Sequence, residues 1–523
     1  MTARGAVVRR LRSGAAAALL VLALPAAAEA PRSAIPWLSE SIEIGHTPPP
    51  PSRPEARTPS ADDTITVTPL GAVSRDGVGL LPPEATGFSP ALWGQEDAAR
   101  VAAMIDAQPE PGVPAAKALF RRLLLAETDA PRGGGAAAQV LVARVDRLLA
   151  VGALAEARAL IDRAGPETPE LFRRWFDIGI LLDDAAEPCA ALRQNPSLSP
   201  TLPARVFCLA RGGDWNAAEI TLTLGQQVGS IDDAQQALLA RFLDPVLFEE
   251  EPEPTMPEPL TALDFLMREA VGLPRPAGAL PLAFLHMDID EHAPMRMRAE
   301  AAERLVVAGA LAPPALLAAY RTGEPAASGG IWDRAQAVQR LDAALAAGAG
   351  ADVGPALVAA DAALAPRGLR VALAQGYGVA LAALDPEPLD PAARRTLAEL
   401  LLLADEAEAA RRAASPEDTA LAALLAIAGA GAEPPAPGDD RAGAALAGLA
   451  ATAAADGREA ELAATVAEGR QGEAILGALA LVRAGTVVDP PALRAALLTL
   501  RLAGQEAAAR AIALETLLVG PIG

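Results

Sequence analysis

The sequence has few aromatic residues. Aromatic side chains make up 3% of its 523 residues, although 52% of the residues are hydrophobic. The apolar content is therefore mostly alanine and leucine, which favour helices, while the residues that strands prefer are scarce. The same shortage disfavours a sugar-binding groove built on aromatic platforms. The composition predicts an all-α protein.

Basic residues are also in short supply. The chain has 44 Lys and Arg residues against 65 Asp and Glu residues, a net charge of −21, and Lys117 is its only lysine. Nucleic acids and anionic membrane surfaces both require clustered cations. We therefore expect no nucleic-acid partner. A P-loop is excluded as well, because its lysine must follow a glycine-rich turn and Lys117 lies in PAAKALF.

Histidine is equally rare, with three residues in the chain. The sequence contains no Gly-x-Ser-x-Gly nucleophile motif and no His-Glu-x-x-His zinc helix. One of the three histidines, His46, falls in a Pro-rich segment that we expect to be disordered. We predict a protein that is not an enzyme and that uses no cofactor.

The first 30 residues have the pattern of a secretory signal peptide. Four arginines precede an apolar run at residues 15–24, and small residues offer cleavage after Ala28 or Ala30. The apolar run is too short for a comfortable membrane span. We expect secretion to the periplasm of a Gram-negative bacterium, without stable membrane insertion after cleavage.

Cysteine is limited to Cys189 and Cys208, which are 19 positions apart. An oxidising compartment permits a bridge between them, and no histidine lies nearby to complete a metal site. We expect a disulfide; the alternative is two free, buried thiols on neighbouring helices.

Proline-rich stretches divide the chain. Residues 31–90 are predicted to form a linker that includes a short extended segment, and its end, which leads to Trp93, is expected to pack on the helices rather than on a partner. An acidic linker is expected at 249–259 and another linker at 432–440. The helical blocks are then 91–248, 260–431 and 441–523.

From about residue 95 the chain repeats a helix, a glycine turn and a second helix. RVDRLLAVGALAEARALIDRA at 144–164 is one example, and the segments at 305–319 and 481–497 both place Pro-Pro-Ala-Leu at a helix start. A single helical hairpin cannot bury its apolar face alone, so such hairpins stack into a solenoid.

The pattern resembles tetratricopeptide-like repeats, whose small-residue positions match Gly152, Ala157 and Ala164. This resemblance implies an irregular helical-hairpin solenoid that offers a concave surface to other proteins. With its signal peptide and Pro-rich segment, the chain is also similar to alphaproteobacterial secreted proteins labelled "antifreeze glycopeptide polyprotein", although tandem Ala-Ala-Thr units are missing. Its architecture is similar to periplasmic motility proteins that assist the flagellar stator.

HMDIDEHAPMRM, residues 286–297, concentrates residue types that bind metals. The candidate ligands are His286, Met287, Asp288, Asp290, His292 and Met295. On a helix the two histidines would lie about 120° apart, and Pro294 favours a break before it. We interpret the stretch as a joint between two helices. The alternative is a copper or zinc site.

Three tryptophans are candidate anchors for a partner. Trp332 follows a Gly-Gly turn, Trp215 follows the predicted N-cap Asp214, and Trp93 ends the extended segment. For Trp332 we favour a wedge between hairpins; the alternative is a partner anchor, because exposed tryptophan is a common binding hot spot.

We expect a non-enzymatic scaffold or adaptor that binds another periplasmic or inner-membrane envelope protein, for example in the flagellar motor. One alternative is an enzyme or enzyme subunit that acts on the cell wall. The other is a metal-handling protein that uses the 286–297 cluster.

Overall fold

The computed structural model of the chain is all-α over the residues that it describes. These are 35, 37, 38 and 74–519, apart from 136, 200, 248–250, 326–328, 349, 432–437, 439 and 456. They form no strand, only isolated β-bridges. The expected signal peptide, residues 1–30, lies outside the described residues. Within them, no helix combines the length and the apolarity needed to cross a membrane.

The first half of the chain forms short helices joined by tight turns. In order, they are η1 (Arg75–Gly77), α1 (Pro83–Thr86), α2 (Ala98–Asp106), α3 (Pro114–Leu125), α4 (Gln139–Ala150), α5 (Leu154–Ala164), α6 (Pro169–Leu181), α7 (Ala186–Gln194), η2 (Pro196–Leu198), α8 (Leu202–Arg211), α9 (Trp215–Gln227), α10 (Asp233–Leu243) and α11 (Ala262–Ala270).

The second half continues in the same way. Its helices are η3 (Leu282–Asp288), α12 (Met295–Ala308), α13 (Pro313–Arg321), α14 (Ile331–Ala347), α15 (Gly350–Leu364), η4 (Ala365–Arg367), α16 (Arg370–Ala382), α17 (Pro391–Leu403), α18 (Ala407–Ala413), α19 (Thr419–Ala428), α20 (Arg441–Ala450), α21 (Arg458–Ala467), α22 (Gln471–Leu481), α23 (Pro490–Leu502) and α24 (Glu506–Leu518).

The predicted hairpin joints are present. Gly152 has a φ of +79° in the turn between α4 and α5, a conformation that favours glycine. Asp214 caps α9, where its carboxylate accepts a hydrogen bond from the backbone N–H of Ala217 at 3.2 Å. Pro313 and Pro490 open α13 and α23. These local signals set the helix boundaries that the sequence predicted.

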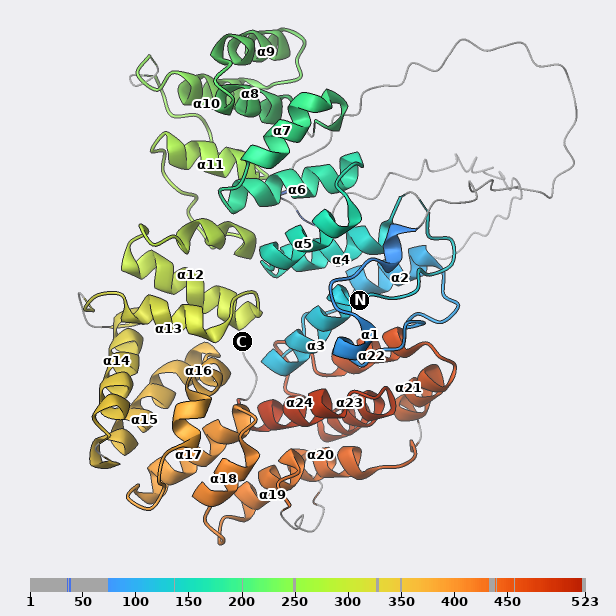
Figure 1. The fold of residues 1–523 in the computed structure, drawn as a ribbon, viewed down its shortest axis with the longest axis vertical. Helices are drawn as coiled ribbons and strands as arrows, with labels where there is room; N and C mark the ends of the chain where they lie inside the picture. Colours follow the sequence, from blue (N-terminus) through green and yellow to red (C-terminus); the bar gives the residue numbers. More distant parts are fainter. Residues whose placement is uncertain are drawn as a thin grey trace, which may run out of the picture.

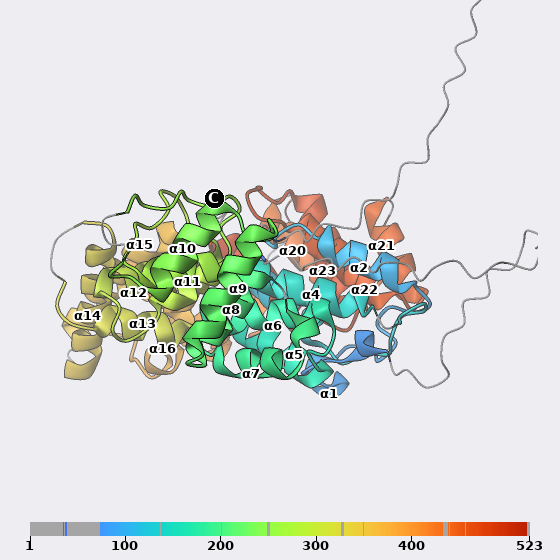
Figure 2. The ribbon, with the colours of Figure 1, turned by 90° about the horizontal axis from the view of Figure 1, so that it is seen from above.

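The helices form an arm and a ring. The arm comprises α4 to α11: it runs out to α9 and returns through α10 to α11, which packs against α6 (Figure 1). The ring comprises α3, α12, α13, α16, α17 and α24, each of which contacts the next, and α24 contacts α3. Seen from above, the array is a flattened body with α9 and α10 nearest the viewer (Figure 2). A tetratricopeptide-like superhelix would be open, whereas this array closes on itself.

The long Pro-rich linker ends earlier than the predicted residue 90. Residues 74–90 include η1 and α1 and belong to the folded array. The buried carboxylate of Asp76 accepts hydrogen bonds from the backbone N–H groups of Val140 (2.9 Å) and Leu141 (3.2 Å), at the start of α4. The buried Arg144 donates to the carbonyl of Val78 at 2.7 Å. The buried carboxylate and the buried guanidinium thus fix this segment through bonds to backbone groups. Composition did not reveal these contacts.

The acidic break at 249–259 does not separate independent blocks. Arg241 donates to the carbonyl of Glu251 at 2.6 Å, and Arg268 donates to the carbonyl of Pro254 at 3.2 Å. The helix that follows, α11, packs on α6 of the preceding block. Most of the break expected at 432–440 lies outside the described residues, and α20 beyond it packs against α19, α23 and α24.

Candidate functional site

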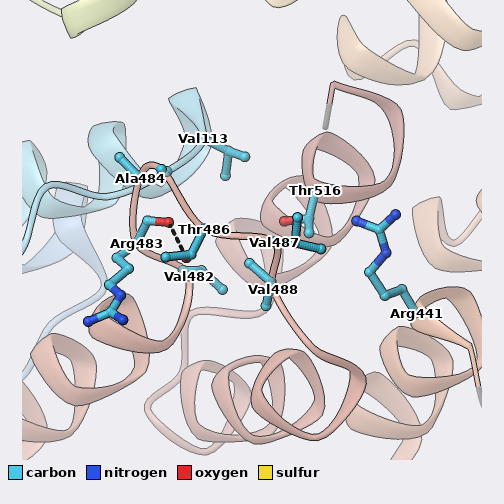
Figure 3. Close-up of a pocket in the computed structure, with 11 residues that line it drawn as sticks. Val113, Arg441, Val482, Arg483, Ala484, Thr486, Val487, Val488 and Thr516 are labelled. Atoms are coloured by element: carbon cyan, nitrogen blue, oxygen red, sulfur yellow. Dashed lines mark hydrogen bonds between the residues drawn. The ribbon is translucent and has the colours of Figure 1, made fainter. Parts of the chain in front are cut away.

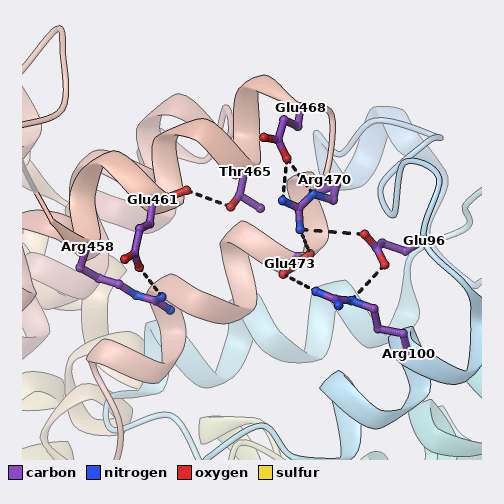
Figure 4. Close-up of polar contacts among 8 residues, drawn as sticks. All are labelled: Glu96, Arg100, Arg458, Glu461, Thr465, Glu468, Arg470 and Glu473. Atoms are coloured by element: carbon purple, nitrogen blue, oxygen red, sulfur yellow. Dashed lines mark hydrogen bonds and ion pairs between the residues drawn. The ribbon is translucent and has the colours of Figure 1, made fainter.

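A seam closes the array where the N-terminal helices meet the C-terminal ones. Along one part of it, ion pairs join α2 and α22 (Figure 4). Arg100 pairs with Glu96 at 3.0 Å and with Glu473 at 3.1 Å, and Arg470 pairs with Glu473 at 2.5 Å. Such solvated pairs stabilise weakly, so they are contacts of the seam and not its main source of stability.

An aromatic wedge forms the apolar part of the seam. The backbone N–H of Gly472 donates to the carbonyl of Leu92 at 2.8 Å. A Cβ at position 472 would lie 2.6 Å from the ring of Trp93, so this close approach requires glycine. Trp93 is buried, with 4% of its surface exposed. It is therefore a core residue of the seam and offers no exposed anchor to a partner.

Backbone hydrogen bonds also join the two sides of the seam, beside a small cavity whose lining residues are drawn in Figure 3. Gly112 donates its N–H to the carbonyl of Val482, and Ala484 donates to Glu110, both at 2.8 Å. The cavity beside this loop, which Val113 and Thr516 also line, measures about 20 Å³. That is room for about one water molecule, so this cavity is too small for a ligand.

A larger pocket lies at the centre of the ring. Its volume is about 450 Å³, which is the size range of small-molecule sites. It is lined from α3 and the loop before it, from η3, α12 and η4, and from the end of α24. The lining residues are Glu110, Lys117, Leu282, Glu303, Arg304, Val307, Ala308, Ala365, Pro366, Arg367, Gly368 and Val519. Because these residues come from both halves of the chain, the pocket depends on the closure of the ring.

One wall of the pocket includes Lys117, the only lysine of the sequence. The Lys117 ammonium, on α3, donates to the carbonyl of Val307 at 2.9 Å and pairs with Glu110 at 3.0 Å. One turn later, Arg121 donates to the carbonyl of Gly309, the C-cap of α12. Both cations thus satisfy carbonyls at the C-terminus of α12, where the helix dipole favours positive charge.

The pocket also holds a buried carboxylate. Glu303, on α12, accepts two hydrogen bonds from Arg334, at 2.7 and 2.9 Å, and one from the hydroxyl of Tyr320 at 2.7 Å. Burial and the neighbouring carboxylate raise the pKa of Tyr320, so this hydroxyl stays a donor. Arg367 lies 3.9 Å from the same carboxylate and is largely exposed.

The charges favour binding rather than acid–base chemistry. Both carboxylates of the pocket, Glu110 and Glu303, are engaged by cations. Three cationic residues line the pocket, Lys117, Arg304 and Arg367, against two acidic ones. The surplus positive charge suits a small anionic group.

The 286–297 cluster is a joint between helices in the structure. The ring Nε2–H of His286 donates to the carbonyl of Gly152 at 2.6 Å, and burial lowers the pKa of this histidine. Asp288 is engaged by Arg275 at 2.8 Å. His292 is exposed and lies 2.8 Å from the carboxylate of Asp290. These candidate ligands thus have different partners.

The two methionines of this cluster, Met287 and Met295, pack partly buried against the core. Within the described part of the chain, no three His, Cys, Asp or Glu side chains are grouped so as to hold a metal ion.

Cys189 and Cys208 are joined by a disulfide in the structure. It links α7 to α8, with the two Cα atoms 5.1 Å apart. Both residues are buried. The bridge fixes the outer half of the arm, next to α9.

The two other candidate tryptophans differ in exposure. Trp332, at the start of α14, is partly buried against the core. Trp215, at the start of α9, is 53% exposed. Of the three candidate anchors, Trp215 is therefore the one whose surface is most open.

Comparison with protein-family models, with curated proteins and with solved structures gives no match. The resemblance to helical repeats thus rests on the residues and on the all-α array itself. Sequence reasoning missed the central pocket, because its walls come from residues as much as 409 positions apart, from Glu110 to Val519. The one available signal was Lys117, whose uniqueness in the sequence says nothing about its neighbours in space.

Proposed function

We propose that this chain is a non-enzymatic scaffold or adaptor of the periplasm that binds another envelope protein. The surface proposed for this contact is the tip of the arm, which we define as α9 together with the residues just after α10. One observation supports this choice: large exposed hydrophobic side chains gather there. Among the described residues, six of nine such side chains lie at the tip: Trp215, Ile220, Leu224, Val228, Val246 and Leu247.

The spacing of these residues is typical of a helix face that contacts another protein. Ile220, Leu224 and Val228 are four positions apart and form one stripe along α9. The other faces of α9 contact α8 and α10, and α9 lies at the far end of the array (Figure 1). Exposed apolar side chains that share one helix face are typical of interaction sites. The partner would present an apolar groove or helix face to this stripe.

Site-specific photocrosslinking in cells tests the proposal. A photoreactive amino acid replaces Ile220 or Leu224 in the full exported chain, and Val379 serves as the control. Val379 is 84% exposed but lies on α16, away from the tip. We expect one dominant envelope protein to be crosslinked from positions 220 and 224, and none from position 379.

Purified proteins then provide the decisive measurement. The crosslinked partner should bind the full chain directly, and Ile220→Asp should weaken that binding by about tenfold or more, since each tenfold is about 1.4 kcal/mol. Val379→Asp should leave the affinity unchanged. Equal crosslinking from all three positions, or equal affinities of the two variants, would contradict a role of the tip.

The cell-wall alternative rests on the central pocket. Its volume and its surplus cation fit a carboxylate-bearing ligand such as a wall-peptide terminus. However, its two carboxylates are both held by cations, so the pocket favours recognition over hydrolysis. Isothermal titration with a D-Ala-D-Ala-terminated peptide tests this second candidate: Arg367→Met should abolish any heat of binding.

A further inference from the structure

A short segment that is distant in sequence from the other described residues is buried against η3. Ile35, Trp37 and Leu38 are each only 5% exposed. The backbone N–H of Leu38 donates to the carbonyl of Ile35 at 3.2 Å, so the segment makes a tight turn. All three side chains belong to the continuous apolar core of the protein.

An aromatic site receives this segment. The Trp37 ring meets the ring of Phe284, on η3, edge to face, with the centroids 5.5 Å apart. Phe284 in turn lies 5.0 Å from Phe265, on α11, and the guanidinium of Arg275 lies over the Phe265 ring at 5.5 Å. Edge-to-face aromatic contacts add attraction beyond simple burial. Trp37 is thus a central anchor with an aliphatic residue on either side.

The connection to the helical array is long. The 35 residues numbered 39–73 separate Leu38 from the first residue of the array, Ser74. A chain of this length spans up to about 120 Å when extended. A flexible linker of this length would hold a docked segment near its site at an effective concentration on the order of millimolar. Tethering of this kind can keep the segment on its site even if the segment is free to leave it and return.

We propose that Phe265 and Phe284 form a docking site for short segments that carry a tryptophan between aliphatic residues, and that residues 35–38 are its resident, exchangeable ligand. The occupant is the chain's own segment, bound within the same molecule. If cleavage follows Ala28 or Ala30 as expected, this ligand lies close to the new N-terminus. A partner segment of the same chemistry would bind only by displacing it.

Competition in the full-length protein tests this inference. A fluorescently labelled peptide of residues 31–42 is titrated into the wild-type protein and into the Trp37→Ala protein, and anisotropy is measured. We expect the Trp37→Ala protein to bind the peptide at least about 30-fold more tightly, because its own segment no longer competes. A peptide with the same Trp37→Ala change should not bind. The Trp215→Ala protein, altered at an exposed tryptophan, should behave like the wild type.

Three results would overturn the inference. Equal peptide affinity of the wild-type and Trp37→Ala proteins would show that the site is not vacated. Loss of helicity in the Trp37→Ala protein, seen by circular dichroism, would show that the segment is a fixed part of the core. A wild-type dimer that becomes monomeric on Trp37→Ala would assign the occupied site to a second copy. None of these results bears on the tip, so the proposed function is tested separately.

Discussion

The side chain of Glu515, on α24, accepts a hydrogen bond at 2.6 Å from the backbone N–H of Ala115, on α3, across a separation of 400 residues. This contact joins the last helix to the first helix of the ring. A carboxylate near a helix N-terminus satisfies an N–H without an intrahelical partner. Glu515 is nevertheless buried, and burial raises its pKa to about 7. The closure of the ring therefore includes a titratable group.

We predict that stability falls with rising pH because of Glu515. Its folded-state pKa of about 7 lies above the ordinary value of 4.5. Between these values the folded state binds more protons than the unfolded state, so the free energy of unfolding decreases as the pH rises. Glu515→Gln keeps the acceptor and removes the charge. The free energy of unfolding of this variant, relative to that of the wild type, should rise by up to about 3 kcal/mol between pH 4.5 and pH 8. Urea unfolding at each pH measures this difference.

Glu506→Gln is the matched control for this prediction. Glu506 lies on the same helix but is exposed, and its hydrogen bond with Arg510 lowers its pKa. Its titration therefore lies at lower pH than that of an ordinary glutamate. The stability difference between Glu506→Gln and wild type should stay constant from pH 5 to pH 8. If the Glu515→Gln difference were equally flat, the carboxylate would not be buried at the seam.

Lys117→Met should destabilise the protein by about 1–3 kcal/mol, because the partly buried carbonyl of Val307 loses its charged donor. Chemical denaturation measures this change. Arg296→Met serves as the control, since Arg296 is exposed and forms an ion pair with Glu300 of its own helix; it should change stability by less than about 0.5 kcal/mol. If Lys117→Met and Arg296→Met lowered stability equally, Lys117 would not stabilise the C-terminus of α12.

The buried ion pair at the pocket should matter more than a comparable exposed one. In the Arg334–Glu303 pair the side chains are 13% and 5% exposed, and in the Arg321–Asp342 pair they are 46% and 30% exposed. Arg334→Met leaves a buried carboxylate without its main partner, so we expect a loss of about 3–5 kcal/mol. Arg321→Met should cost about 1 kcal/mol or less. Urea unfolding of both variants at pH 7 makes the comparison.

Reduction of the disulfide should destabilise the arm. The bridge between Cys189 and Cys208 closes a loop of 19 residues, and a bridge of this span stabilises by about 3 kcal/mol. We expect a lower thermal midpoint in the presence of dithiothreitol. A Cys189→Ser/Cys208→Ser protein should melt at one temperature with or without the reductant. If the thermal midpoint of the wild-type protein is the same with and without dithiothreitol, the bridge is not formed in solution.

The helical hairpins could be predicted because their signals are local. Gly152 marks a turn, Asp214 caps a helix and Pro490 opens one, and each acts on residues within a few positions. The all-α class followed from composition for the same reason, since alanine and leucine favour helices one residue at a time. The joint at 286–297 followed from Pro294, which stands just before α12.

The closure could not be predicted, because it depends on residues that no local pattern relates. Trp93 was a candidate anchor for a partner, yet it packs on Gly472. Nothing in the sequence near either residue indicates the other. The burial of Trp37 could not be predicted either, because the residues around it are Pro-rich and indicate a linker. The signal that was available is the pairing of Trp37 with two aliphatic neighbours in a stretch otherwise poor in large apolar residues.

The closed ring is the central claim, and the distance between its first and last helices tests it most directly. Ala118 on α3 and Ala507 on α24 are exposed, and no free cysteine competes for the label among the described residues. Spin labels at Ala118→Cys and Ala507→Cys allow pulsed electron paramagnetic resonance. Two packed helices of this length predict one narrow distribution below about 40 Å. A broad distribution centred well beyond that distance would show an open array and contradict the account.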